Sequence, residues 1–166
     1  MNLMKLIRNE VAADASITII RADQFGKLPS LPYATYKIIG DRKGKGRENI
    51  SHKDQPNELQ ESRTQERNAT ISFNVYGTSH DDAYEVASQL RRWFEGRWFE
   101  GRGSFFLDSL EVAVANVSDV QNRTTFLIDS YDEKWGFDVI IRYNETDEYE
   151  IDYFDKVEYE LTVERE

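Results

Sequence analysis

The sequence predicts an α+β fold with a mainly antiparallel β-sheet flanked by two helices. Two segments have the apolar spacing of a helix, and five or six others have the alternation or the β-branched and aromatic content of strands. Helices and strands do not follow one another as regular βαβ units, which disfavours a parallel sheet. A length of 166 residues fits one domain over residues 1–166, and the 39% apolar content can build its core.

The N-terminal part of the chain predicts one helix and two strands. Apolar residues recur at helical spacing within residues 3–13. A short β-branched run follows at residues 17–20. Pro29 and Pro32 interrupt the chain before residues 33–39, whose β-branched and aromatic content is typical of a strand.

The segment 41–67 predicts a polar loop or arm between two strands. It holds seven basic and six acidic residues, and only Ile50 and Leu59 are clearly apolar. Such a segment cannot repay its ordering entropy by burial, so we expect it to be exposed and mobile in the free subunit. Long loops in compact domains are often functional, although a featureless insertion is the alternative. The candidate contacts with a neighbouring subunit are Arg42, Lys43, Lys45 and Arg47.

The middle of the chain predicts a half-buried strand followed by an amphipathic helix. Apolar and polar residues alternate over residues 69–76, and Gly77 ends the strand. Ser79 is suited to cap the next helix, with Asp82 three residues later in a weak variant of the capping box. The predicted core between helix and sheet is Ile71, Phe73, Val75, Val86, Leu90, Phe137, Val139 and Leu161.

The end of this helix contains a direct repeat, because the pentapeptide 93–97 recurs as residues 98–102. Five residues advance a helix by roughly 500°, so the two copies cannot share one face. We therefore expect one Trp-Phe pair to pack beneath the helix and the other to lie at its rim. The repeat is either a tolerated duplication or an aromatic edge suited to subunit contact.

The C-terminal part of the chain predicts strands and carries the net charge. Strands are expected over residues 112–117, 137–142 and 157–163. Residues 129–166 hold fourteen acidic and four basic side chains, a balance of −10 that equals the net charge of the chain. An acidic face repels phosphate, which disfavours tight nucleic-acid binding, and a solvated face that aids solubility is the plainest interpretation. The candidate acidic face is Asp147, Glu148, Glu150, Asp152, Glu158 and Glu160.

Few residues suggest catalysis. The absence of cysteine excludes disulfides, thiolate metal sites and a cysteine nucleophile, and His52 and His80 have no second ligand at metal-binding spacing. The C-terminal carboxylates could hold Mg²⁺, but they are evenly spread and lack a Lys or His base. We expect no enzyme activity and no cofactor, and a small metal-dependent hydrolase or nuclease is the weaker alternative. Neither a signal peptide nor a membrane span is expected.

Three segments in order resemble the bacteriophage neck or tail-terminator family of tail-completion and head–tail joining proteins. They are residues 31–39, residues 71–77 with the helix from His80, and residues 130–139. The resemblance implies a structural virion protein, made in the bacterial host cytoplasm. It also implies a hexameric ring on the last ring of the tail tube, which stops tube growth and contacts the head-side connector. A head-completion protein and a soluble regulatory binding module remain alternatives.

The resemblance also suggests where the acidic residues lie in the ring. A ring around DNA that passes as cargo should have a wall that does not grip the polyanion. The acidic face would then line or rim the channel. An acidic face that points outward into solvent is the alternative.

Overall fold

The structure is a computed structural model that describes residues 3–55, 58–97, 99–128 and 131–151. The helical elements are α1 (Leu3–Ala15), α2 (His80–Phe94), a 3-10 turn η1 (Phe99–Gly101) and α3 (Arg102–Ser109). The strands are β1 (Thr18–Arg21), β2 (Tyr33–Lys43), β3 (Asn49–Gln55), β4 (Glu58–Tyr76), β5 (Ala113–Val117), β6 (Gln121–Asn122), β7 (Thr125–Phe126), β8 (Tyr131–Asp132) and β9 (Lys134–Ile151). Within the described residues no helix is both long and apolar enough to cross a membrane.

Two long strands, β4 and β9, organise the sheet. They pair from Leu59–Ile151 at one end to Tyr76–Lys134 at the other. Within the described part of the chain, the seven-stranded sheet has the order β1-β2-β4-β9-β5, while β3 pairs with β4 and β6 pairs with β9. The pairing of β1 with β2 is parallel, and the other pairings are antiparallel. The predicted α+β class with a mainly antiparallel sheet is confirmed.

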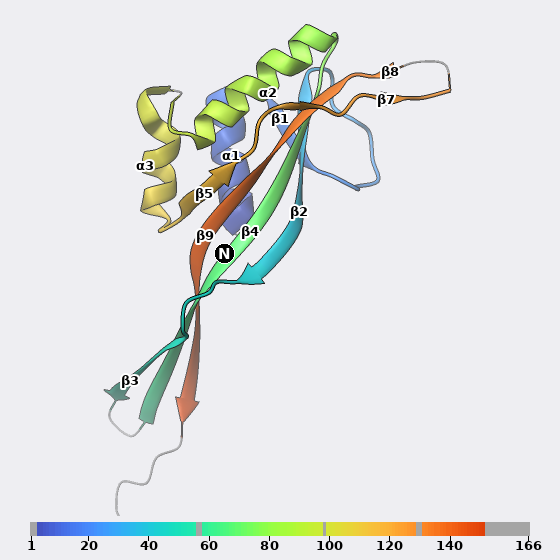
Figure 1. Ribbon diagram of the computed structural model, residues 1–166. Coiled ribbons are helices and arrows are strands. Elements are labelled where there is room, and N and C mark those ends of the chain that lie inside the picture. Colours follow the sequence, from blue (N-terminus) through green and yellow to red (C-terminus); the bar gives the residue numbers. More distant parts are fainter. Residues whose placement is uncertain (1–2, 56–57, 98, 129–130, 152–166) are drawn as a thin grey trace, which may run out of the picture.

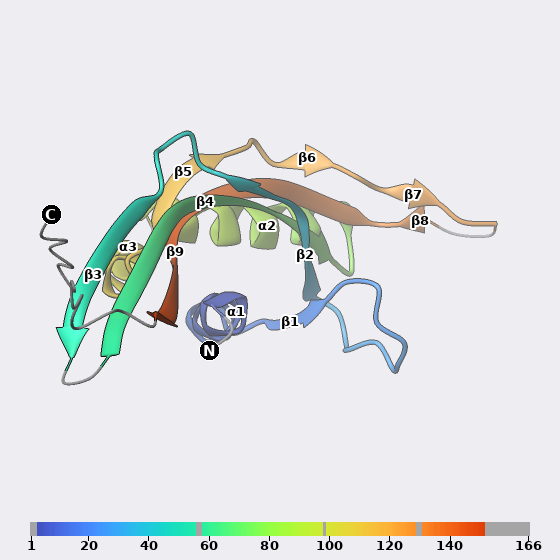
Figure 2. The same ribbon diagram turned by 90° about the horizontal axis from the view of Figure 1, so that it is seen from below.

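The core lies between the helices and one face of the sheet. The sheet is curved, and α1, α2 and α3 lie on its concave side (Figure 2). Phe73 of β4 stacks on Phe137 of β9 with ring centroids 5.4 Å apart, and Phe94 of α2 packs against Phe73 at 5.2 Å. Leu90 and Trp93 of α2 are fully buried in the same cluster. Burial of this aromatic and aliphatic surface is the main stabilising contribution of the fold.

Most of the predicted core is confirmed. Ile71, Phe73, Val75, Leu90, Phe137 and Val139 are all fully buried. Val86 is half-buried and packs at the periphery of the cluster, and Leu161 lies outside the described residues. The cap of α2 is also confirmed, because the backbone N–H of Asp82 donates to Ser79 Oγ at 3.2 Å.

The prediction of a loop over residues 41–67 is wrong in its secondary structure. Strand β2 continues to Lys43, β3 follows a short turn, and β4 begins at Glu58. A polar composition disfavours a segment that packs in the core, but it does not prevent strands whose backbone groups pair with one another. The long pairing of β4 with β9 supplies those partners, and it was not visible in the local pattern.

A third helix, α3, was not predicted. Gly96 and Gly101 adopt φ of 68° and 82°. This left-handed conformation often follows the end of a helix, and glycine adopts it without steric cost. Gly96, in the first copy of the pentapeptide repeat, therefore follows the end of α2, and Gly101, in the second copy, is the N-cap of α3. The expectation that both copies lie along one helix is wrong for this reason.

The first aromatic pair of the repeat is buried as expected. Trp93 donates its indole N–H to Asp14 of α1 at 2.7 Å, and Phe94 lies beside it in the core. Arg102, the last residue of the second copy, lies 3.3 Å from the same Asp14 carboxylate. The two copies thus meet at one residue of α1, while Trp98 lies outside the described residues.

Candidate functional site: the arm, the groove and the apolar end

The first candidate surface is a three-stranded extension, here called the arm. It consists of β3, β4 from Glu58 to Arg67 and β9 from Tyr143 to Ile151. The arm extends away from the helices as a continuation of the same sheet (Figure 1). Its side chains are mostly polar, and within the part of the chain that the structure describes no helix covers it, so its faces are available to another subunit.

The pairing register sorts the arm residues onto two faces. Residues opposite one another in an antiparallel ladder share a face, and successive residues alternate between faces. Arg63 is opposite Asp147, on the face that continues the core side of the sheet. Ser62 is opposite Glu148, on the outer face.

One carboxylate of the arm is buried. Glu61 is only 8% exposed, its Oε2 lies 3.0 Å from His52 Nε2, and its Oε1 accepts a hydrogen bond from Arg63 Nε. The Arg63 hydrogen bond, with the His52 contact, lowers the pKa of Glu61 below its usual range. The Arg63 guanidinium also lies 5.8 Å from the centre of the Tyr149 ring. This network joins β3, β4 and β9 across the arm.

A second network holds the base of the arm. Arg67 of β4 donates to Asp41 of β2 at 2.9 Å and lies 3.5 Å from Glu145 of β9. Its side chain is 22% exposed, so solvent screens these pairs only in part. One guanidinium therefore links the three strands where the arm leaves the body of the protein.

The predicted basic contacts lie together at the start of the arm. Arg42 and Lys43 end β2, and Lys45 and Arg47 lie in the turn before β3. All four side chains are exposed. Arg42 and Lys43 are successive residues of β2 and therefore lie on opposite faces, so the four side chains surround the start of the arm and do not form one patch.

The predicted acidic residues do not form one surface. Asp147, Glu148 and Glu150 are exposed on β9, but Asp147 is on the opposite face from the other two. Asp152, Glu158 and Glu160 lie outside the described residues. In the described ranges, no three His, Cys, Asp or Glu side chains are grouped so that they could hold a metal ion.

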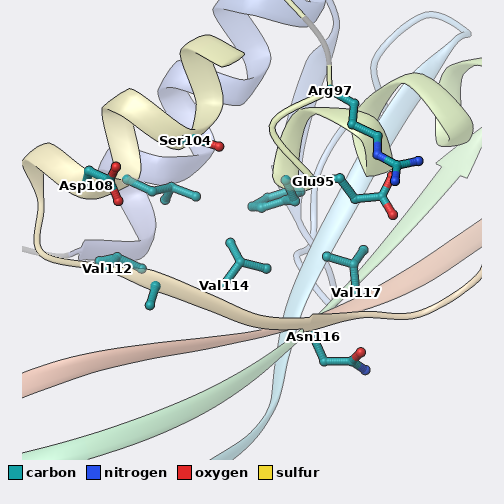
Figure 3. Close-up of a pocket in the computed structure, with 11 residues that line it drawn as sticks. Glu95, Arg97, Ser104, Asp108, Val112, Val114, Asn116 and Val117 are labelled. Atoms are coloured by element: carbon teal, nitrogen blue, oxygen red, sulfur yellow. The ribbon is translucent and has the colours of Figure 1, made fainter.

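The second candidate surface is a cavity of about 580 Å³ between the end of α2, α3 and β5, here called the groove. Val112, Val114 and Val117 point into it, whereas Asn116 points away (Figure 3). Phe94 and Leu107 close its inner end, and both are nearly fully buried. The polar side chains around it are Glu95, Arg97, Ser104 and Asp108. Sequence reasoning missed the groove because α3, which forms one wall, was not predicted.

The third candidate surface, here called the apolar end, lies at the opposite end of the molecule from the arm (Figure 1). The hairpin of β7 and β8 exposes large apolar side chains, and Leu127 lines a shared cavity with Leu28 from the loop before β2. Several exposed large apolar side chains at one end of a molecule indicate a protein contact. The exposed residues are Leu28, Phe126, Leu127, Ile128 and Tyr131.

Comparison with known protein families identifies the family of this chain. A family model described as Phage neck terminator protein matches residues 1–165, which is nearly the whole chain. No curated protein matches the sequence.

Proposed function

Because this chain belongs to the phage neck terminator protein family, whose role is structural, we propose that it forms a ring, of six copies, on the last ring of the tail tube. The ring stops growth of the tube and presents a surface to the head. The family match over residues 1–165 is the observation that carries this proposal. The protein is a component of the phage neck, and its role in the proposed ring is non-catalytic.

The distribution of surfaces supports assembly into a ring. The arm and the apolar end are two different surfaces at opposite ends of the molecule, and a head-to-tail contact between neighbouring copies joins two different surfaces. The exposed apolar residues at one end are costly in a free monomer and gain stability when another protein covers them. A ring closes such contacts without leaving unpaired ends.

The partners that follow from this role are a tail tube protein on one side and a head-side connector or completion protein on the other. DNA passes through the ring as cargo, without sequence-specific contacts. The acidic C-terminal part of the chain is consistent with this, because it offers few cations to neutralise phosphates.

Polymerisation of the cognate tail tube protein tests the proposal directly. Adding the purified chain should shorten the tubes in proportion to its concentration, and negative-stain images should show a ring at one tube end. The matched control is the same chain with Phe126→Ser and Tyr131→Ser, which removes exposed apolar surface without touching the core. Unchanged tube length, with the chain bound only to purified connector, would instead identify a head-completion protein.

A further inference from the structure

Strand β5 forms an open edge of the sheet next to the groove. It is the last strand in the order β1-β2-β4-β9-β5, and within the described residues no other strand pairs with its outer side. An open edge presents backbone N–H and C=O groups that can pair with a further strand. The groove lies on the same side as Val114 and Val117, so a strand added there would place its inward side chains beside these two valines.

The edge of β5 differs in charge from the other open edges. Residues 112–117 contain no charged residue and no proline, the groups that usually protect an edge strand. By contrast, β3 carries Lys53, β1 ends at Arg21, and β9 beyond Tyr143 carries four carboxylates. A register shift between Val114 and Asn116 bends β5, but it adds no charge. Of these edges, β5 is the one best suited to accept an apolar strand.

The chain itself contains a segment with the matching pattern. In residues 157–163, Val157, Tyr159, Leu161 and Val163 alternate with Glu158, Glu160 and Thr162. This period of two gives one apolar and one acidic face in an extended strand. The segment follows the described part of β9 after a short spacer.

We infer that residues 157–163 of one copy add as a strand to the open edge of β5 in a neighbouring copy, with their apolar side chains in the groove. Backbone pairing along β5 supplies affinity, and the alternating apolar residues supply register. The inference rests on the proposed self-assembly, for which it names the linking segment. The acidic side chains of the segment remain on the opposite face, in contact with solvent.

Distance favours a neighbouring copy over the same chain. Ala113 of β5 is opposite Arg142, and β9 then runs away from it to Ile151. Nine residues at about 3.3 Å each place the end of β9 about 30 Å from β5. A return within the same chain would use about nine residues, up to residue 160, before reaching β5. Only Leu161 and Val163 of the apolar set would remain to pair.

Charge disfavours the other site within the same chain, a hairpin back onto β9. The free part of β9 carries Glu145, Asp147, Glu148 and Glu150. A hairpin would bring Glu158 and Glu160 against this row, and like charges across a ladder are destabilising. The uncharged edge of β5 imposes no such repulsion.

Disulfide cross-linking tests the inference, because the chain has no cysteine of its own. One copy carries Val114→Cys, and a second, larger tagged copy carries a single cysteine at position 159 or 161. Matched controls place the cysteine at position 158 or 160, on the acidic face. After mild oxidation we expect about tenfold more cross-linked heterodimer for an odd position than for the even positions, because only one face approaches Val114 closely enough to bridge.

The outcomes separate this inference from the proposed function. Rings that form without preferential cross-linking at odd positions would overturn the inference and leave the ring intact. An intramolecular disulfide in a single chain carrying both Val114→Cys and Leu161→Cys would overturn the exchange between copies. A chain that neither shortens tubes nor cross-links contradicts both proposals. Removing residues 152–166 should abolish the ring while the thermal unfolding of the monomer changes little.

Discussion

Phe73 illustrates how single residues determine the stability of this fold. Its ring lies between β9 and α2, in contact with Phe137 and Phe94, and it is fully buried. Aromatic pairs in this tilted and stacked geometry contribute beyond their buried area. The burial of Phe73 was predicted correctly from the sequence, because Phe73 alternates with the polar residues Ser72 and Asn74 along β4.

Replacing Phe73 by alanine should lower the free energy of unfolding by about 3–5 kcal/mol, through lost burial and a residual cavity. Denaturant titration measures this change. The control is Phe105→Ala, since Phe105 of α3 is 72% exposed and its loss should change stability by less than about 0.5 kcal/mol. Equal effects from the two variants would contradict the assigned core.

Glu61 provides a test by pH. Its hydrogen bond to Arg63 lowers its pKa in the folded state, so the stabilisation is present above the ordinary glutamate value of about 4.3 and is lost as pH falls through the lowered pKa. Carboxyl-carbon NMR should give a midpoint below the ordinary value. In Arg63→Ala the midpoint should rise. Hydrogen-exchange protection of β3 should fall in acid in the unchanged protein, and in Glu61→Gln this fall should disappear. A midpoint unaffected by Arg63→Ala would contradict this network.

At the scale of elements, the arm shows how polar strands persist outside the core. Its stability comes from the continuous pairing of β3 and β9 with β4, and from the networks of Glu61 and Arg67. Protease cleavage of the free subunit is therefore expected in the turn over residues 44–48 and not throughout residues 41–67. Strong protection of that turn in the monomer would contradict the expectation.

The arm should be dispensable for folding but not for assembly. Lys43 is paired with Arg67, so replacing residues 44–66 by an Asn-Gly turn closes a regular hairpin at the base. The melting temperature of the body should change little, whereas native mass measurements should show weaker self-association. A second variant, with Arg42, Lys43, Lys45 and Arg47 changed to glutamine, keeps the arm and tests the basic contacts alone. Full assembly of the arm-deleted chain would exclude the arm from the subunit interface.

At the scale of the whole molecule, the role of the acidic residues depends on whether they line the channel of the proposed ring. Glu148 and Glu150 are on the outer face of the sheet, and Asp147 is on the face that continues the core side. Because these faces are on opposite sides of the sheet, only one of them can face the channel of the ring. We expect the face of Glu148 and Glu150 to line or rim the channel, where it keeps DNA from binding tightly.

Two adjacent substitutions test this placement with the same change of charge. Glu148→Lys should make the assembled ring bind DNA in a salt-sensitive manner and slow genome ejection, because it places one cation per copy along the channel. Asp147→Lys should leave DNA binding unchanged. Filter binding at several salt concentrations measures the difference, and assembly should survive in both variants. If neither ring binds DNA, the acidic residues face outward into solvent, and if both rings bind DNA equally, the channel is not lined by the face of Glu148 and Glu150 alone.

The sequence by itself determined those parts of the protein whose information is local. The strand around Phe73, the cap at Ser79 and the apolar stripe of α2 each follow from periodicity and side-chain chemistry within one segment. The resemblance to neck terminators came from the order of such segments, and the family match supports it. These features depend on which residues are apolar, and the apolar residues are known from the sequence alone.

Only the tertiary structure decided the features that depend on pairing between distant segments. Residues 58–67 are a strand because residues 143–151 lie beside them, not because of their own composition. Because residues 143–151 form a strand, Asp147 and Glu148 lie on opposite faces, and the chain reversal from Gly96 to Gly101 produced α3 and with it the groove. Nearly every residue has backbone groups that can form hydrogen bonds, so a pattern of side chains does not show which strands pair. The partners of a polar strand are therefore known only when the chain is folded.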